Sequence, residues 1–468
     1  MATSGQNRRF RSNRVLAVTV GLVGLVCMAG GNFMGPCDQA LPPQIGDSGV
    51  TGKYVGSERC AQCHARVHEM WSETLHGNAL ATLEAIGQGT NSECLPCHTV
   101  GYGEEGGFVD RATTNALANV GCEDCHGPGR DHVMNVADES LRPPKDISAE
   151  LCGRCHTGEH QPNFDQWQMS AHAQVTEHVA EDFTMGESLN RCGTCHSGDF
   201  RYLAFIEGET VEDDLLMGVA RGDQNAIVCV ICHKPHERTF NAPFAEEGRD
   251  YQLRFPEVMD PVPTNTIEAA TNFERFNLCG QCHRSRGETW RTTSRPPHHS
   301  IQSNVYIGEM PMPEDEDPLV LSRSTTHRLI REQCATCHMY RKDFESEEAP
   351  AISGHLFTPN FEGCVDSGCH PSAANAQSLA ANLKNLVTAR LAAIKSRLDV
   401  GLGGAAGWEY SSNGGPDTAG QAAITDNVKK VRFLYYYTMN DGSFGTHNPA
   451  YVDALLDEAE DLLDDEGI

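Results

Sequence analysis

The cysteines and histidines of this chain follow one repeated spacing. In eight places two cysteines are separated by two residues, and a histidine follows the second cysteine directly. In chain order these motifs are Cys60, Cys63 and His64; Cys94, Cys97 and His98; Cys122, Cys125 and His126; Cys152, Cys155 and His156; Cys192, Cys195 and His196; Cys229, Cys232 and His233; Cys279, Cys282 and His283; and Cys334, Cys337 and His338. The ninth, Cys364, Cys369 and His370, has four residues between its cysteines. Together the nine use 18 of the 20 cysteines and nine of the 21 histidines.

This spacing predicts covalent attachment of haem c. The two thiols add to the vinyl groups along one edge of a porphyrin, and the next histidine places an imidazole nitrogen on the iron as proximal ligand. One such motif is a moderate signal, whereas nine predict nine covalently attached haems. In the ninth motif the longer spacer must bulge, and Gly368 supplies the backbone freedom for it.

Zinc and disulfides are the competing explanations. Two Cys-x-x-Cys units could form a four-thiolate zinc site, but zinc does not require a histidine after every pair. Disulfides would need the thiols that haem attachment consumes. Neither alternative explains the surplus of histidines.

Twelve histidines outside the motifs are candidates for the sixth iron ligand. The predicted distal ligands are His76, His132, His172, His236, His298, His327, His355 and His447. His68 and His160 lie too close to their own motifs to reach the far side of the same ring, so each serves a neighbouring haem or is solvated. Only one of the adjacent pair His298 and His299 is expected to bind iron, and His178 has the weakest case. Twelve histidines outside the motifs are enough to give each of the nine expected irons a second histidine ligand.

Residues 60–79 and 152–173 form an internal repeat. In each copy a tryptophan precedes a histidine by five residues: Trp71 before His76, and Trp167 before His172. We expect each such pair to share one helix, with the tryptophan packed on a porphyrin while the imidazole binds iron.

The composition is lean for a chain of 468 residues, with 39% hydrophobic and 7% aromatic residues. Nine haems would leave 48 residues of positions 37–468 for each. We therefore expect a mainly α fold with much irregular loop, in which stacked haems form the core of a multihaem cytochrome c. The net charge of −28 disfavours nucleic acid and suits redox partner proteins with basic patches.

The chain is expected to divide into a signal peptide at 1–36, a nine-haem region at 37–372 and C-terminal helices at 373–468. Four arginines between positions 8 and 14 precede an apolar stretch at 15–29, which is signal-peptide length and short for a membrane span. No Ala-x-Ala cleavage site follows, so an uncleaved anchor is the alternative. Neither Cys27 nor Cys37 follows a convincing lipobox, so membrane attachment is not expected. Without the leader and its four arginines the charge becomes −32.

The last hundred residues carry no attachment motif. A helix is predicted over 374–400, with Leu379, Leu383, Leu386 or Val387, Leu391, Ile394 and Leu398 on one face, and a second with Ile424, Val428, Val431 and Tyr435 in register. The Gly-rich stretch 401–416 separates them. A turn at 441–449 then presents His447, and a short acidic helix follows. This region is either a helical hairpin for stability or dimerisation, or a unit that also returns His447 to a distant haem.

Several segments resemble the exported multihaem cytochromes related to the tetrahaem electron carrier of ammonia oxidisers, and the hydroxylamine oxidoreductase and pentahaem nitrite reductase superfamily. The resembling residues are 54–60, 94–103, 106–108, 121–129 with His132, 297–299, 337–339, 354–359 and 441–449. The resemblance implies that His76, His132, His172, His298, His327, His355 and His447 are distal ligands. The nitrite reductases mark their catalytic haem with a Cys-x-x-Cys-Lys motif, which this chain lacks.

Two functions follow from this pattern. The first is a periplasmic or extracellular nonahaem cytochrome that transfers electrons, because a bis-histidine iron has no open position for a substrate. The second is an oxidoreductase that acts on a small nitrogen or sulfur oxyanion at one five-coordinate haem. Arg286, Arg291 and Arg295 could then supply charge near His298; no catalytic residue is assigned. A homo-oligomer, a filament or an electron-storing subunit remain open alternatives.

Overall fold

The computed structural model describes residues 52–241, 250–255, 277–310, 326–330 and 332–468, so the predicted signal peptide lies outside the described residues. The described chain consists of helices joined by loops, with isolated β-bridges in place of strands. The helices are α1 Ser57–Ser72, α2 Ala79–Ala85, α3 Leu95–His98, α4 Arg111–Thr114, α5 Cys122–His126, α6 Arg130–Met134, α7 Ala149–Gly153, α8 Asn163–Gln168, α9 Glu177–Thr184, α10 Leu189–His196, α11 Gly198–Arg201, α12 Cys229–Cys232, α14 Gln302–Ile307, α15 Cys334–His338, α16 Glu362–Asp366, α17 Ala373–Leu402, α18 Thr418–Ala423, α19 Asp426–Asn440 and α20 Pro449–Asp465. The predicted mainly α fold with much irregular loop is confirmed.

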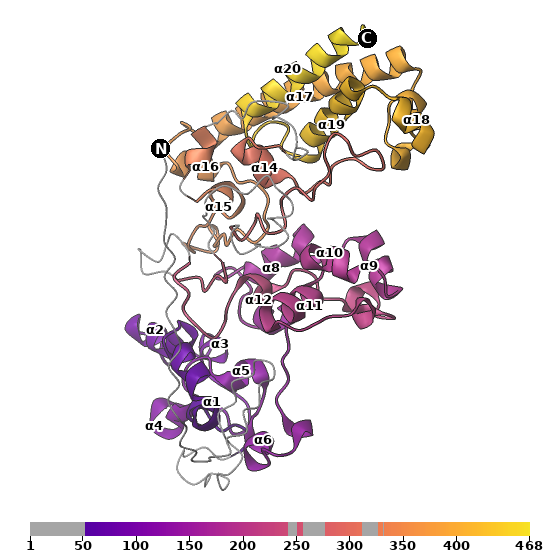
Figure 1. Ribbon diagram of the computed structural model, residues 1–468. Helices are drawn as coiled ribbons and strands as arrows, with labels where there is room; N and C mark the ends of the chain where they lie inside the picture. Colours follow the sequence, from indigo (N-terminus) through magenta and orange to yellow (C-terminus); the bar gives the residue numbers. More distant parts are fainter. Residues whose placement is uncertain (1–51, 242–249, 256–276, 311–325, 331) are drawn as a thin grey trace, which may run out of the picture.

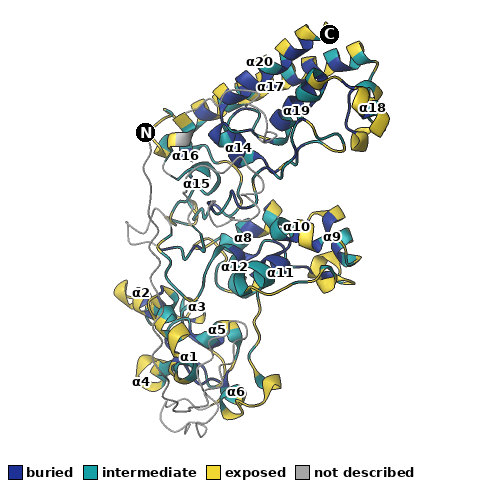
Figure 2. Ribbon diagram, viewed as in Figure 1, coloured by how far each residue is buried: buried dark blue, intermediate teal, exposed yellow. Residues whose placement is uncertain are grey.

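The helices form three lobes along an elongated molecule (Figure 1). The first lobe comprises residues 52–148, the second 149–255 and the third 277–468. The first and second lobes each have a small buried cluster, around Leu80 and Phe183 respectively. The third lobe holds the largest one, which α14, α17, α19 and α20 build together. Figure 2 shows buried residues concentrated along α17, α19 and α20, with more intermediate and exposed residues in the first lobe.

The first C-terminal helix occupies the predicted position, but the second begins at Asp426, two residues after Ile424, which lies between α18 and α19. On α17 the residues Val387, Leu391, Ile394 and Leu398 are buried, as are Ile424, Val428, Val431 and Tyr435 of the second predicted helix. Leu379 and Leu386, expected on the buried face, are half exposed instead. Val387 takes the buried position for which Leu386 was the alternative, and Leu379 faces a large cavity.

Three long helices pack together in this region, because α17 lies against both α19 and α20. Arg390 of α17 joins α17 to α20 through ion pairs of 2.8 Å each with Asp453, Asp457 and Glu460. None of the described helices is long and apolar enough to cross a bilayer.

A buried carboxylate fixes the start of the first lobe. Glu123 accepts hydrogen bonds from the backbone nitrogens of Val55 (3.0 Å), Gly56 (2.8 Å) and Gly129 (2.7 Å). Gly129 belongs to the Gly-Pro-Gly turn that follows the third motif. One side chain inside an attachment motif therefore joins two segments of backbone, at Val55–Gly56 and at Gly129.

Candidate haem-binding site

Most of the attachment motifs form short helices that end at or beside the histidine. The helices α3, α5, α10 and α15 end at His98, His126, His196 and His338, and in α1 the backbone leaves the helical region at His64 (φ −111°, ψ 40°). Helical residues three apart lie on one face, about 5–6 Å between Cβ atoms, so the two thiols point the same way. The seventh motif forms turns instead of a helix. In the ninth, Gly368 has φ 77°, which confirms the backbone freedom predicted for its longer spacer.

One continuous cavity of about 2520 Å³ lies among these motifs. Cysteines or histidines from eight of the nine motifs line it, the first motif being the exception, and so do eight histidines outside the motifs. Leu75, Met169, Leu356 and Leu379 line it as well, although each of them is exposed. An apolar ring system in the cavity would cover these four side chains. The lining therefore fits a porphyrin.

Six motif histidines face a histidine from elsewhere in the chain. The ring centroids are separated by 5.9 Å in His156 and His76, 6.1 Å in His126 and His236, 6.1 Å in His283 and His172, 6.3 Å in His196 and His298, 6.0 Å in His233 and His355, and 6.2 Å in His338 and His447. Metal–imidazole bonds of about 2 Å put two opposed nitrogens about 4 Å apart and the ring centres about 6 Å apart. The spacing fits two axial ligands of one iron.

Backbone carbonyls orient several of these rings. Nδ1 lies 2.9 Å from the Ala79 oxygen in His98 and 2.7 Å from the Tyr251 oxygen in His233. His126 and His338 make the same kind of contact, with the carbonyls of Pro144 and Phe357. A carbonyl can only accept, so Nδ1 carries the proton and Nε2 keeps a lone pair that can bind iron.

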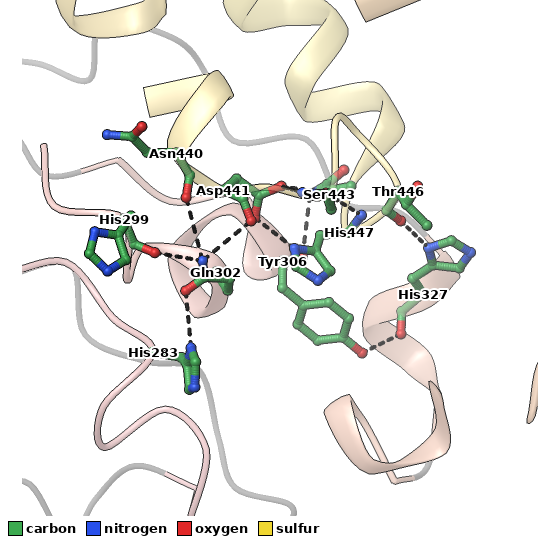
Figure 3. Close-up of polar contacts among 11 residues, drawn as sticks. His283, His299, Gln302, Tyr306, His327, Asn440, Asp441, Ser443, Thr446 and His447 are labelled. Atoms are coloured by element: carbon green, nitrogen blue, oxygen red, sulfur yellow. Dashed lines mark hydrogen bonds and ion pairs between the residues drawn. The ribbon is translucent and has the colours of Figure 1, made fainter. Parts of the chain in front are cut away.

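His447 differs, because its Nδ1 lies 2.6 Å from a carboxylate oxygen of Asp441 (Figure 3). Burial by itself lowers the pKa of His447, but the attraction and hydrogen bond of the carboxylate outweigh it and raise that pKa. Asp441 was not identified from the sequence, where its only signal was its place six residues before a candidate ligand.

His76 is held by the backbone that leads into the third motif. The Trp71 indole Nε1 donates to the Val120 carbonyl at 3.1 Å, and the Val120 nitrogen donates to the His76 carbonyl at 3.2 Å. Val120 stands two residues before Cys122.

The second copy of the repeat reproduces this arrangement. The Trp167 indole donates to the Ile227 carbonyl at 2.9 Å, and the Ile227 nitrogen donates to the His172 carbonyl at 3.1 Å. Ile227 likewise stands two residues before a motif cysteine, Cys229. The internal repeat therefore extends to the start of a second motif, which the sequence comparison missed.

The expectation that each tryptophan shares a helix with its histidine is wrong. Helix α1 ends at Ser72 and α8 at Gln168, whereas His76 and His172 lie in separate 3₁₀ turns, His76–Asn78 and Ala171–Ala173. The chain turns between them, because the carbonyl of each histidine accepts a hydrogen bond from a distant segment, the one before the third motif for His76 and the one before the sixth for His172.

The other histidines outside the motifs fall into two groups. Burial lowers the pKa of His132, and the nearby His64 lowers it further, while His327 has Nδ1 2.8 Å from the Thr446 carbonyl. His68 packs on Trp71, His160 packs on Phe344 and His299 stacks on His298, with ring centroids 5.3, 3.8 and 4.2 Å apart. His178 lies near His196 and His299, whose pKa values it helps to lower.

Three motif histidines lack a facing histidine ring. All 21 histidines fall within the described ranges, and none of their rings pairs with His64, His98 or His370 at the 5.9–6.3 Å spacing of the six pairs. Of the three arginines near His298, Arg295 is ion-paired to Glu288 at 2.6 Å and Arg291 lies over the Trp290 ring, while Arg286 lines the cavity.

Thiols from different motifs lie next to one another. The hydrogen-bonded neighbours are Cys60 and Cys122, Cys97 and Cys155, Cys152 and Cys229, Cys195 and Cys282, and Cys337 and Cys364. The Cys195 thiol lowers the pKa of its neighbour Cys282. The first motif is thus adjacent to the third, the second and sixth to the fourth, the fifth to the seventh, and the eighth to the ninth.

Phe357 connects three of the histidine pairs. Its ring contacts His172 edge-on at 4.3 Å and His355 at 5.8 Å, and its carbonyl accepts from His338 Nδ1 at 2.9 Å. Its φ of 57° lies in a region that a bulky residue rarely adopts. Phe357 was not singled out from the sequence, because nothing in its own spacing signals its contacts with His172 and His338.

Known proteins resemble this chain over different lengths. The family model "Cytochrome c554 and c-prime" matches residues 59–127, the segment with the first three motifs. Cytochrome c-554 of Nitrosomonas europaea is 30% identical over 134 residues, which are 22% of this chain. The chain spans 57% of that relative's length. The crystal structure of the outer cell wall cytochrome OcwA shares the fold over 88% of this chain and all of its own, with a TM-score of 0.57 and 20% identity.

Proposed function

We propose that this chain, a multihaem c-type cytochrome related to the cytochromes of ammonia oxidisers, carries nine haems c and passes electrons along them. The observation that carries the proposal is the set of six histidine pairs with ring centroids 5.9–6.3 Å apart. Two imidazoles on one iron leave no position for a substrate, so the iron can change only its oxidation state. The protein then supplies spacing, orientation and electrostatics, while the haems carry the electrons.

The proposed ligand assignment follows the geometry. The nine motifs supply the thioether bonds and the proximal histidines, and the six pairs supply six distal ligands. His132 is assigned to the iron of His64, its neighbour. His327 is assigned to the iron of His370, because both belong to the third lobe and line the same cavity, and the Thr446 carbonyl holds the proton of His327 on Nδ1.

Adjacent motifs support a path through the whole molecule. Thiol neighbours link the first motif to the third and the second and sixth to the fourth, and Cys125 of the third motif lies near Cys152 of the fourth. Phe357 joins the sixth, seventh and eighth. The eighth motif then leads to the ninth. Electrons would enter and leave at opposite ends of the elongated molecule.

We place the protein in the periplasm or outside the cell. The predicted leader at 1–36 supports export, as do the names of the two relatives, a cytochrome c-554 and an outer cell wall cytochrome. The charge of −28 favours redox partner proteins with basic patches, and a homo-oligomer or filament would lengthen the path.

The haem count tests this proposal directly. Pyridine haemochrome assay and intact mass of the purified holoprotein should both give nine haems. The double variant Cys364→Ser with Cys369→Ser should give eight, with all other haems retained. Eight in the unmodified protein would refute attachment at the ninth motif, and electron paramagnetic resonance with fewer than six low-spin irons would refute the ligation.

A second candidate function rests on His98 and His370, which have no histidine ring facing them. An iron left five-coordinate at either one could reduce or oxidise a small nitrogen or sulfur oxyanion. A high-spin signal altered by nitrite or hydroxylamine would support this enzyme. Nine low-spin irons and no high-spin signal would exclude it.

A further inference from the structure

One histidine ring differs from the others in the group that its Nδ1 contacts. Among the described residues, ten histidines have a hydrogen-bond partner at Nδ1, and nine of these partners are neutral: backbone carbonyls, hydroxyls or, at His283, the amide of Gln302. The partner of His447 is the Asp441 carboxylate, at 2.6 Å (Figure 3). A hydrogen bond to a carboxylate is roughly twice as strong as a neutral one.

The position of Asp441 is unfavourable for a charge. The Asp441 side chain is fully buried, and it directly follows α19, where the negative end of the helix dipole repels an anion. Hydrogen bonds from His447 and from the hydroxyl and backbone N–H of Ser443 offset the cost of burying this carboxylate. A neutral acceptor would orient the ring without this cost, as carbonyls do for the other histidines.

The ring that faces His447, and that would bind the same iron, has a neutral group at its Nδ1. His338, 6.2 Å from His447, donates its Nδ1 proton to the Phe357 carbonyl. One axial ligand therefore has a neutral acceptor behind it and the other a charged one. Within the described residues, none of the other five histidine pairs has a carboxylate at Nδ1.

We propose that Asp441 is a positioning residue that makes the haem attached at Cys334 and Cys337 the lowest-potential haem of the chain. This rests on the proposed electron-transfer function. The carboxylate draws the Nδ1 proton towards itself and makes His447 a stronger electron donor to the iron. Ferric iron, with one more positive charge than ferrous, gains more from such a ligand, so adding one electron to it becomes less favourable. This haem is then the last to be reduced and the first to be oxidised.

The variant Asp441→Asn tests the charge while it keeps the shape and one acceptor oxygen. A charge-assisted hydrogen bond exceeds a neutral one by enough to change an equilibrium about tenfold. We expect the ferrous-to-ferric ratio of the lowest-potential haem to rise about tenfold at a fixed electrode potential, which is about 59 mV for one electron. Spectropotentiometric titration of the intact holoprotein measures this shift, and low-temperature electron paramagnetic resonance measures the altered ligand field of one low-spin haem.

Two further variants keep the test decisive. Ser443→Ala removes a competing donor from Asp441 and should move the lowest potential in the opposite direction. Ser353→Ala removes a neutral hydroxyl beside His355 Nδ1 and should leave the lowest potential unchanged. An unshifted titration curve in a fully loaded Asp441→Asn protein, or upward shifts in both Asp441→Asn and Ser443→Ala, would overturn the inference. A wrong haem count or missing low-spin signals in the unmodified protein would instead overturn the proposed function.

Discussion

Replacing His172 by glycine should open one of the nine irons that we propose. The His172 ring faces His283 at 6.1 Å, and burial lowers its pKa to about 4, so it is a neutral imidazole at pH 7. Its removal takes away no charge and leaves a ring-sized space beside Phe357. The lost ring contact with Phe357 costs about 1 kcal/mol of folding stability, which covalently attached haems should tolerate. We expect one ninth of the iron to change from low spin to high spin.

Electron paramagnetic resonance with spin quantitation measures this change, and added imidazole should restore the low-spin signal by filling the vacated space. The matched control is His160→Gly, since His160 also belongs to the second repeat copy but packs on Phe344 and faces no motif histidine. This control should keep every low-spin iron. A fully low-spin His172→Gly protein, or an equal high-spin signal in the control, would refute the assignment of His172.

Three other predictions concern the protein around the haems. Glu123→Gln should lower the free energy of unfolding of the first lobe by about 3 kcal/mol in guanidinium titrations, because three backbone donors lose a charged acceptor and one of them meets an amide N–H. Gly363→Ala should reduce the haem count from nine to eight, since a Cβ there would stand 2.0 Å from the Thr336 carbonyl and push the ninth motif from the eighth; an unchanged count would contradict it. Burial raises the pKa of Asp124 to about 7 from about 3.9 when unfolded, so the folded protein binds more protons between these values. Stability should therefore fall as pH rises from about 4 to about 7, and Asp124→Asn should remove this part of the slope.

The sequence predicted what depends on local spacing. The nine motifs, the C-terminal helices and the turn before His447 all follow from patterns within about thirty residues of chain. The buried stripe on α17 was correct from Val387 to Leu398, where the helix packs on side chains. It was wrong at Leu379, because a helical pattern cannot tell a face that meets side chains from one that meets a cavity.

Pairing of the histidines could not be predicted, because it depends on contacts between distant segments. His76 faces His156 and His447 faces His338, separations of 80 and 109 residues that no local pattern encodes. The shared helix expected for Trp71 and His76 failed for the same reason: a backbone hydrogen bond from Val120 turns the chain between them. Phe357 contacts His172 and His338, which no local pattern places beside it, whereas Asp441 had only its place six residues before His447 as a signal.

The distribution of the histidine pairs explains how a chain with so few hydrophobic residues holds its lobes together. Five of the six pairs join residues of different lobes: two link the first to the second, and three link the second to the third. By contrast, the largest buried apolar cluster of the second lobe contains residues of that lobe alone, and so does the largest cluster of the third lobe. On the proposed ligation, each of these five irons is bound from both sides of a lobe boundary, so coordination bonds replace the apolar interface that the composition cannot supply. The same placement puts haems at every boundary that an electron must cross, and one set of bonds then serves both stability and conduction.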